Sequence, residues 1–581
     1  MKTGFGMAEL DSLFASMIRA NDEWLAKGAS KPGGSPQVNL ADAWEAMLSG
    51  SPASWSRLVE ATGQYYQQQI ELAMRVAGAT LNREPEPSAA SGKGERRFDA
   101  PEWTQFPLFD YIKQSYLLTS KALLQAVDGA YLDEKTKQQV RFYTNQFLDA
   151  TSPANYALTN PEVLKLAMET KGENFASGFK NLLQDLENGR ISMSAASAFQ
   201  VGENLANTPG SVIYENELIQ LIQYRPTTVE VKEIPVLFVP SVVNKYYILD
   251  LTPETSLVRY LVSEGFTVFM MSWRNVSRAQ QQLTWDDYVQ QGVQAAVDVV
   301  RRITRQDQIN AVGYCTGGAL LSSALAVRAV HDERPVANMT LLMTMLEFSD
   351  PGEIGVFLDP ATMAQFEAKY ANGGVVPGRE LTMGFSSLRA NDLIWSFVVN
   401  NYLKGKTPEA FDLFYWNTDD SNLPGPMFSY YLRNCYIQNK LVQPNALTVS
   451  GAAVDLRKID LPTYVFAASE DHLVPWKTAY QSVNHLDGDI EFVLGGGGHI
   501  TGPLNPVSRN KRSYLAGGRL NTNAEDWQAS ARSVSGSWWP HWKSWLGERS
   551  GKKIAAPKRL GNNTYKEIEP APGRYVKERS T

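Results

Sequence analysis

The chain has 581 residues, of which 43% are hydrophobic and 20% are charged, a composition typical of a globular protein with room for two or more domains. Its net charge of −6 argues against a general nucleic-acid-binding protein. The only two cysteines, Cys315 and Cys435, leave no disulfide framework and no cysteine-based metal site, and they fit a reducing cytoplasm. We find no signal-peptide core and no apolar run long enough for a transmembrane helix.

Residues 1–205 predict a mainly helical N-terminal domain. Apolar residues recur at helical spacing in four segments, 10–18, 66–74, 111–127 and 140–148. Asn160-Pro161 has the form of a helix start, with the asparagine as cap and the proline at the first helical position. A linker rich in Pro, Ser and Gly is expected at about 83–95.

Residues 206–581 predict a second domain in which strands and helices alternate. Apolar segments predict six strands, at 235–240, at 267–273, in the lead-in to Cys315 from Ile309, at 339–345, at 463–468 and at 491–494. Helical patterns fall between them, at 256–264, 285–303 and 316–330. This alternation indicates an α/β fold with a mostly parallel sheet covered on both faces.

Two segments of the second domain depart from this rhythm. Residues 347–447 contain many aromatic side chains and no clear strand, which suits a cap or lid inserted over an active site. An ordinary helical subdomain with an aromatic core would look the same. The C-terminal tail, 551–581, carries eight Lys or Arg against three Glu. Most such runs are solvated, and attraction to an anionic granule surface is a weaker hypothesis.

The second domain is organised around Cys315, in the sequence Gly313-Tyr314-Cys315-Thr316-Gly317-Gly318. An apolar strand leads into this turn and an Ala/Leu-rich helix follows, which is the nucleophile-elbow pattern of an α/β-hydrolase with Cys in place of Ser. The helix start favours a thiolate. The alternative is a glycine-rich turn with a buried, inert cysteine.

A cysteine nucleophile needs a base and a group that orients the base. In this fold the acid and then the histidine follow the nucleophile along the chain. His499 lies in a glycine-rich loop after the last predicted strand, and Asp471 follows the strand before it. We therefore predict a Cys315–Asp471–His499 triad.

The remaining candidates fit these roles less well. His331 lies at the far end of the elbow helix, His485 lies between the last two strands, and His541 lies in a Trp-rich stretch that reads as packing. His472 suits a supporting or binding role, and Glu470 is the alternative to Asp471 as the acid. Cys435 lacks an elbow and is expected to be buried.

The oxyanion hole is expected to use backbone amides. The residue after the nucleophile, Thr316, should supply one N–H, and the loop 241–244 after the first predicted strand should supply the other. Within that loop we predict Val243.

The chain resembles the polyhydroxyalkanoate synthases, most closely class I, over about residues 96–581. The resemblance rests on nine stretches: NKYYILDL (244–251), SWRN (272–275), GYCTGG (313–318), YWN (415–417), NLPGP (422–426), DHLVPW (471–476), GHI (498–500), GSWWP (536–540) and APGRYVK (571–577). Family members often have Ser-Gly-His-Ile-Ala-Gly where this chain has Gly-Gly-His-Ile-Thr-Gly at 497–502. This difference leaves His499 in place.

The resemblance implies an acyltransferase that polymerises (R)-3-hydroxyacyl-CoA, chiefly 3-hydroxybutyryl-CoA, and releases CoA without any cofactor. Cys315 would carry the acyl group, and His499 would take the thiol proton. Asp471 would either orient His499 or activate the hydroxyl of the next monomer. Asp250, Arg389 and Trp416 match family positions near the substrate channel, although ordinary salt bridges and core packing would explain them equally well.

The resemblance also implies a setting and partners. Members of the family dimerise through the cap region and work in the cytoplasm at the surface of polymer granules, beside phasin-type proteins. Two rival hypotheses stay open. The same triad could serve a thioesterase or esterase, or the chain could be a non-catalytic granule-coating protein with a degenerate hydrolase fold.

Overall fold

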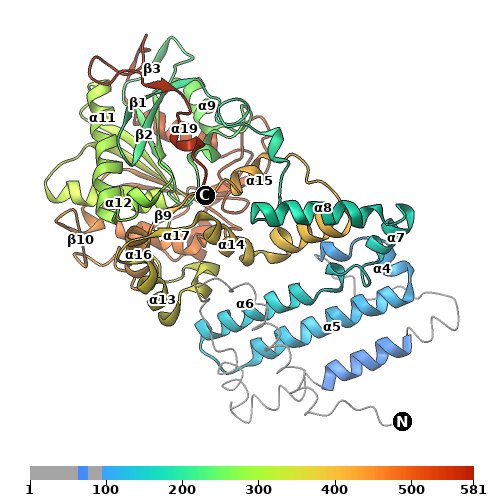
Figure 1. The fold of residues 1–581 in the computed structure, drawn as a ribbon. Coiled ribbons are helices and arrows are strands. Elements are labelled where there is room, and N and C mark those ends of the chain that lie inside the picture. The colour runs from blue at the N-terminus through green and yellow to red at the C-terminus, as the bar shows by residue number, and fades with distance from the viewer. Residues whose placement is uncertain (1–62, 76–94, 581) are drawn as a thin grey trace. The chain divides into compact units, whose positions relative to one another are not determined.

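The computed structural model describes residues 63–75 and 95–580 (Figure 1). The chain divides into two compact units. Among the described residues, the first unit comprises 63–75, 95–193 and 385–409, and the second comprises 194–384 and 410–580. The predicted helix at 10–18, and all of the predicted linker except Glu95, lie outside the described residues.

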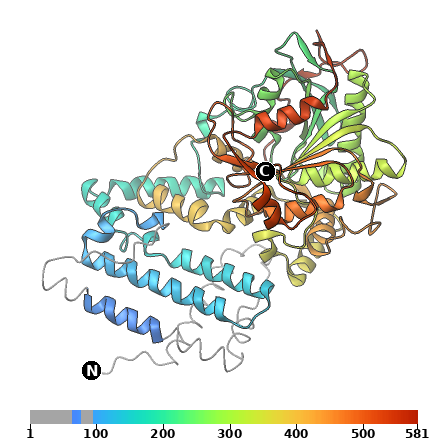
Figure 2. The same cartoon turned by 180° about the vertical axis from the view of Figure 1, so that it is seen from behind.

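The first unit is helical, as predicted. Its elements are the helix at 63–75, η1 (Arg96–Phe98), α4 (Glu102–Gln105), α5 (Pro107–Gly129), α6 (Glu134–Thr151), η2 (Pro153–Asn155), α7 (Pro161–Glu169), α8 (Glu173–Asn188), η8 (Asn391–Trp395) and η9 (Val398–Leu403). Helices α5 and α6 lie side by side (Figures 1 and 2), and the Tyr116 hydroxyl of α5 donates to the Leu148 carbonyl of α6 at 2.8 Å. The predicted helix start is confirmed, because the Asn160 side chain accepts the N–H groups of Glu162 and Val163.

Residues 385–409 group with these helices, whereas the sequence analysis placed them in the insertion of the second domain. The reason is close packing between α8 and η9. A Cβ at Gly178 would lie 1.9 Å from the Tyr402 carbonyl oxygen, so only glycine allows this approach. The Tyr402 hydroxyl donates to Asp185 at 2.7 Å, and the Asn174 amide donates to the Leu403 carbonyl at 2.7 Å.

The second unit is built on an 11-stranded sheet in the order β15-β14-β13-β12-β7-β6-β4-β5-β2-β1-β17. Its strands are β1 (Gly210–Glu215), β2 (Ile219–Tyr224), β4 (Val236–Val239), β5 (Val268–Trp273), β6 (Ile309–Tyr314), β7 (Val336–Leu342), β12 (Thr463–Ala468), β13 (Ile490–Gly495), β14 (Ser513–Ala516), β15 (Arg532–Ser535) and β17 (Glu569–Pro570). The six central strands, from β13 to β5, are parallel, and both flanks are antiparallel. The short strands outside the sheet are β3 (Glu230–Lys232), β8 (Val375–Val376), β9 (Leu423–Pro424), β10 (Leu447–Val449), β11 (Ala452–Val454) and β16 (Lys553–Ala555).

All six predicted strands are the parallel ones, which confirms the predicted fold class. One boundary was wrong: the strand expected at 339–345 runs from Val336 to Leu342. It ends there because Met343 has a φ of 51°, outside the extended range of a strand.

Helices cover both faces of the sheet (Figure 2). The longer helices of the second unit are α9 (Leu257–Ser263), α11 (Ala295–Thr304), α12 (Thr316–Val330), α13 (Pro360–Tyr370), α16 (Gly425–Tyr431), α17 (Trp476–Ser482), α18 (Ala524–Ser530) and α19 (Trp539–Glu548), and α14 (Gly378–Leu388) begins in this unit and ends in the first. The shorter ones are η3 (Ala196–Ala198), η4 (Tyr246–Asp250), η5 (Arg278–Gln280), α10 (Trp285–Asp287), η6 (Tyr288–Gln294), η7 (Gly352–Phe357), α15 (Asp412–Asn417), η10 (Leu432–Ile437), η11 (Leu456–Lys458), η12 (Val483–His485) and η13 (Tyr575–Lys577).

The core of the second unit lies on both sides of the sheet because side chains alternate along each strand. In β6, Ile309 and Ala311 join a cluster with α11 and α12, while Val312 and Tyr314 join a second cluster with α9 and α19. The central strands therefore read as continuous apolar runs. None of the helices within the described ranges is long and apolar enough to cross a membrane.

The C-terminal tail is bound to the second unit, contrary to the expectation of a solvated tail. Strand β16 pairs with β3, and β17 pairs with β1. The Lys245 ammonium donates to the Val576 carbonyl at 2.8 Å and to the Glu578 carbonyl at 2.6 Å. Arg579 pairs with the buried Asp419 at 2.9 Å. Charge counting missed these contacts because their partners lie far away in the sequence.

Candidate active site

The nucleophile elbow has the geometry that its sequence predicts. Strand β6 ends at Tyr314, α12 begins at Thr316, and Cys315 between them has φ 53° and ψ −124°. A non-glycine residue in this region carries strain of about 1–3 kcal/mol. The surrounding glycines allow the turn: a Cβ at Gly313 would lie 2.4 Å from the Cα of Gly318, and a Cβ at Gly317 would lie 2.2 Å from the Val239 carbonyl oxygen.

Hydrogen bonds hold the strained residue in place. The Cys315 N–H donates to the Leu342 carbonyl at 2.9 Å. The Cys315 carbonyl accepts the Gly318 N–H at 2.9 Å and the Thr344 hydroxyl at 3.1 Å. Cys315 is partly exposed, so its thiol is fixed at the start of α12 and remains accessible.

Asp471 and His499 meet because they follow neighbouring parallel strands. Asp471 comes after β12, His499 comes after β13, and the ends of paired parallel strands lie at one edge of the sheet. The His499 Nδ1–H donates to Asp471 Oδ2 at 2.7 Å. The other carboxylate oxygen, Oδ1, accepts the N–H groups of Leu473 at 2.8 Å and Val474 at 2.9 Å. The carboxylate therefore fixes the imidazole, and two backbone amides fix the carboxylate.

Neighbouring groups raise the pKa of His499. Burial alone would lower the pKa of His499, but the Asp471 carboxylate and the Cys315 thiol outweigh it, and the pKa is raised well above its usual value. The side chain of Asp471 is fully buried, and that of His499 is 7% exposed. With Nδ1 bonded to Asp471, Nε2 is left to exchange a proton with Cys315, so the three side chains form a constellation suited to acyl transfer.

The two predicted oxyanion donors, Thr316 and Val243, lie in two segments that contact each other, the start of α12 and the loop after β4. Thr316 is the first residue of α12, where its amide has no acceptor within the helix. Val243 lies in the loop after β4, and its N–H donates to the Ser241 hydroxyl at 3.2 Å. The Val242 N–H donates to Thr316 Oγ1 at 3.0 Å. The oxyanion roles of Thr316 and Val243 stay predictions.

The four predicted substrate residues occupy different settings. Asp250 is buried and accepts the hydroxyls of Thr208 and Ser256, and burial raises its pKa to about 6. Trp416 is buried and donates its indole N–H to the Lys245 carbonyl at 2.7 Å. Their substrate-binding roles stay predictions.

The other two lie in different parts of the chain. His472 is half-buried beside Asp471, and its carbonyl accepts the Glu353 N–H at 3.1 Å. Arg389 belongs to the first unit, where it pairs with Asp392 at 3.1 Å. Their proposed contacts with substrate also stay predictions.

Two tyrosines, Tyr431 and Tyr436, lie near Cys315, although their sequence does not single them out as part of the site. Tyr431 stacks on Trp285 with ring centroids 5.3 Å apart, and Tyr436 meets Phe348 edge-on at 4.8 Å. Burial raises the pKa of both tyrosines, with a smaller contribution from the nearby Cys315. The signal was the aromatic density of the insertion, but periodicity could not show which rings reach the thiol.

Two of the remaining histidines have local partners, and Cys435 is buried. His485 pairs with Glu347 at 3.0 Å, and His541 Nδ1 hydrogen-bonds the Tyr464 hydroxyl at 3.0 Å. Cys435 is buried, and burial raises the pKa of its thiol. This thiol is therefore protonated at neutral pH, as the packing interpretation requires.

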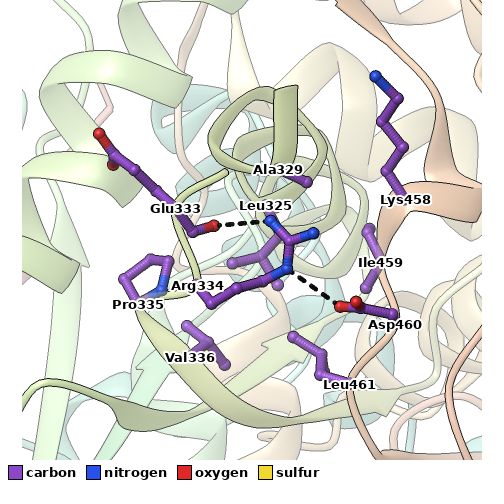
Figure 3. A pocket seen from close by; sticks show the side chains of 10 residues that line it. All are labelled: Leu325, Ala329, Glu333, Arg334, Pro335, Val336, Lys458, Ile459, Asp460 and Leu461. Atoms are coloured by element: carbon purple, nitrogen blue, oxygen red, sulfur yellow. Dashed lines mark hydrogen bonds and ion pairs between the residues drawn. The ribbon is translucent and has the colours of Figure 1, made fainter. Parts of the chain in front are cut away.

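A surface depression at the far end of α12 is separate from this site (Figure 3). Its lining residues are Leu325, Ala329, Glu333, Arg334, Pro335, Val336, Lys458, Ile459, Asp460 and Leu461. Arg334 crosses the depression to bond Asp460 at 3.2 Å. Helix α12 runs from Thr316 to Val330, so this end lies about 20 Å from the nucleophile. The ion pair thus joins the loop after α12 to the loop before β12.

Comparisons with known proteins cover most of the chain. Residues 94–261 match the family model for the N-terminus of poly-beta-hydroxybutyrate polymerase (PhaC), and residues 234–506 match the alpha/beta hydrolase fold. The poly(3-hydroxyalkanoate) polymerase subunit PhaC of Cupriavidus necator is 47% identical over 503 residues, covering 84% of this chain and 85% of that one. The poly(3-hydroxyalkanoate) polymerase of Methylorubrum extorquens is 39% identical over 499 residues, covering 85% and 82%. A solved monoacylglycerol lipase of Paleococcus ferrophilus covers 58% of this chain and 100% of its own at 11% identity and a TM-score of 0.33.

Proposed function

This chain belongs to the family of poly(3-hydroxyalkanoate) polymerases, and we propose that it polymerises (R)-3-hydroxyacyl-CoA through an acyl thioester on Cys315. The observation that carries the proposal is the elbow turn at Cys315 together with the neighbouring His499, whose Nδ1 lies 2.7 Å from Asp471 Oδ2. The substrate is itself a CoA thioester, and the steps below need no cofactor.

In the first step the acyl group moves from CoA to the enzyme. His499 Nε2 takes the thiol proton, and the Cys315 sulfur attacks the thioester carbonyl carbon. The carbonyl oxygen becomes an oxyanion that the Thr316 amide faces, and the Asp471 carboxylate, which raises the pKa of His499, stabilises the imidazolium at this stage. The C–S bond to CoA breaks, and His499 returns the proton to the CoA sulfur. One thioester replaces another, so the step is nearly balanced in energy.

In the second step the polymer grows by one ester bond. His499 takes the proton from the 3-hydroxyl of the acceptor, and the hydroxyl oxygen attacks the acyl carbon on Cys315. The C–S bond breaks, and His499 returns its proton to the sulfur. Both oxygens of Asp471 already have partners, in His499 and in the amides of Leu473 and Val474. This supports the orienting role of Asp471 over direct activation of the hydroxyl.

Water must be kept from the acyl-enzyme, or the product would be a free hydroxy acid. Tyr431 and Tyr436 lie near Cys315 and pack against Trp285 and Phe348, and this apolar cluster supports the exclusion of water. From the family resemblance we also propose a preference for 3-hydroxybutyryl units, homodimer formation through the cap region, and action at the surface of cytoplasmic polymer granules with phasin-type proteins.

The test is to incubate the purified protein with (R)-3-hydroxybutyryl-CoA and to follow free CoA by chromatography and polymer by turbidity. Cys315→Ala is the test variant, and Cys435→Ala is the matched control because it removes the only other thiol. We expect CoA release with polymer in the wild type and in Cys435→Ala, and neither in Cys315→Ala. CoA release with soluble 3-hydroxybutyrate would instead establish a thioesterase.

A further inference from the structure

Two hydrogen bonds join the start of α12 to the loop 241–243, and a third lies within the loop. The Val242 N–H donates to Thr316 Oγ1 at 3.0 Å, and the Val243 N–H donates to Ser241 Oγ at 3.2 Å. The two hydroxyls, Ser241 Oγ and Thr316 Oγ1, bond each other at 3.1 Å. Thr316 is therefore linked through its side chain to the loop that is expected to supply the second oxyanion donor.

The contact is buried and closely fitted. Ser241 is 6% exposed, Val242 is 4% and Thr316 is 5%. Next along α12, Gly317 leaves no room for a Cβ against the carbonyl oxygens of Val239, at 2.2 Å, and Pro240, at 2.5 Å. The helix start and the loop thus touch through backbone on one side and through hydroxyls on the other. The hydroxyls of Thr316 and Ser241 can be removed by substitution without a steric clash, whereas any side chain at Gly317 would clash.

We propose that the Thr316 hydroxyl is a positioning group for the oxyanion hole, acting with the Ser241 hydroxyl. The Thr316 amide faces the developing oxyanion, and the Thr316 side chain fixes the distance between α12 and the loop that is expected to supply the second donor. One residue thereby sets both donors. This inference rests on the proposed function, because it takes the oxyanion of the first acyl transfer as the species being stabilised.

The alternative is that the hydroxyls only satisfy buried backbone groups. Under that alternative, loss of the Thr316 hydroxyl leaves the Val242 N–H without an acceptor and destabilises the protein. Reactions at Cys315 that form no oxyanion would then suffer as much as those that do. Under the proposal only oxyanion-forming reactions slow, because the thiol, His499 and Asp471 are held by other contacts.

The experiment compares Thr316→Val, which has the shape of threonine without the hydroxyl, with Thr316→Ser, which keeps the hydroxyl. Ser323→Ala is the matched control, because Ser323 is also buried on α12 and donates to the Ala319 carbonyl within the helix at 2.8 Å. Two reactions are timed on each protein: acylation of Cys315 by p-nitrophenyl butyrate, which forms an oxyanion, and alkylation of Cys315 by iodoacetamide, which does not.

We expect Thr316→Val to slow acylation by about 10- to 100-fold, since removing an oxyanion donor outright costs about 100- to 1000-fold. Its alkylation rate should match the wild type, and Thr316→Ser and Ser323→Ala should keep both rates. Equal slowing of both reactions, or no slowing of acylation, would overturn the proposal. If Thr316→Val does not fold, Ser241→Ala is tested in the same way with the same two outcomes. The ester readout does not require polymer formation, so failure of the proposed polymerase function would be seen separately, as absence of polymer from (R)-3-hydroxybutyryl-CoA.

Discussion

Asp471→Asn should disable the base without removing it, and the reason lies in how the carboxylate is held. Oδ1 accepts the N–H groups of Leu473 and Val474, which only an oxygen can do. In the variant the amide oxygen must keep that position, so the NH₂ group faces His499 Nδ1. The imidazole must then accept at Nδ1 and carry its proton on Nε2, which leaves Nε2 unable to take the thiol proton of Cys315.

The size of the effect follows from the same geometry. The carboxylate lies 2.7 Å from His499 Nδ1 and stabilises the imidazolium formed during the reaction. At an effective dielectric constant of about 20, which also describes buried sites, two charges about 4 Å apart attract by about 4 kcal/mol. The wrong tautomer alone lowers the turnover of a Ser-His-Asp enzyme by about 10⁴-fold. We therefore expect Asp471→Asn to slow acylation by about 10³- to 10⁴-fold, equivalent to about 4–5.5 kcal/mol.

The assay is rapid-quench measurement of CoA release, with enzyme in excess for a single turnover and with substrate in excess for elongation. If Asp471 orients His499, both rates fall together. If Asp471 instead activates the acceptor hydroxyl, the single-turnover release stays close to the wild-type rate and only elongation stops. If both rates fall by less than about tenfold, the tautomer argument is wrong, because a general base accelerates such a reaction by about 100-fold or more.

Three further predictions concern the supporting structure. Gly317→Ala places a Cβ 2.2 Å from the Val239 carbonyl oxygen, so the elbow must move and the rate of Cys315 acylation should fall by more than about 100-fold. Gly384→Ala is the control: a Cβ there would meet nothing within 4 Å, and the acylation rate should stay at the wild-type value. Asp419→Asn removes the buried counter-ion of the Lys245 ammonium, which lies 2.9 Å away and is 4% exposed. The free energy of unfolding should fall by about 3–5 kcal/mol. Calorimetry should show this as a lower Tm, and an unchanged Tm would contradict the prediction. Burial raises the pKa of Asp250 to about 6, so the native state keeps a proton that the unfolded chain releases from about pH 4. Stability should therefore fall by up to about 3 kcal/mol as pH rises from about 4 through 6; Asp250→Asn should remove this contribution, and a pH dependence of Tm identical to that of the wild type would contradict it.

The sequence predicted the central sheet, the elbow turn and the pairing of Asp471 with His499 because each depends on a local pattern. Each parallel strand is a short apolar run. Cys315 follows such a run directly, and Asp471 and His499 come shortly after two others. In a parallel sheet the strand ends meet at one edge, so the chain order was enough to bring Asp471 and His499 together.

Features set by contacts between distant segments could not be predicted in this way. The assignment of 385–409 to the helical unit depends on Gly178, whose missing side chain admits the Tyr402 backbone. The docking of the C-terminal tail depends on Lys245, which reaches carbonyls more than 300 positions away along the chain. No local pattern marks either residue for these roles.

The end of the strand at Leu342 is a smaller feature that the local sequence did not predict. Residues 343–345 continue the apolar run, but Thr344 turns back to bond the carbonyls of Leu342 and Cys315, both at 3.1 Å. The requirements of the elbow thus override strand propensity at this point.

The central claim is that the acyl group is carried on Cys315, and mass spectrometry with butyryl-CoA tests it most directly. This substrate lacks the 3-hydroxyl, so an acyl-enzyme formed from it cannot be elongated. Peptides from protein quenched in acid should carry a butyryl thioester on Cys315, removable by hydroxylamine, and none on Cys435. A butyryl group on any other residue, or CoA release from (R)-3-hydroxybutyryl-CoA by a Cys315→Ala variant, would contradict the account.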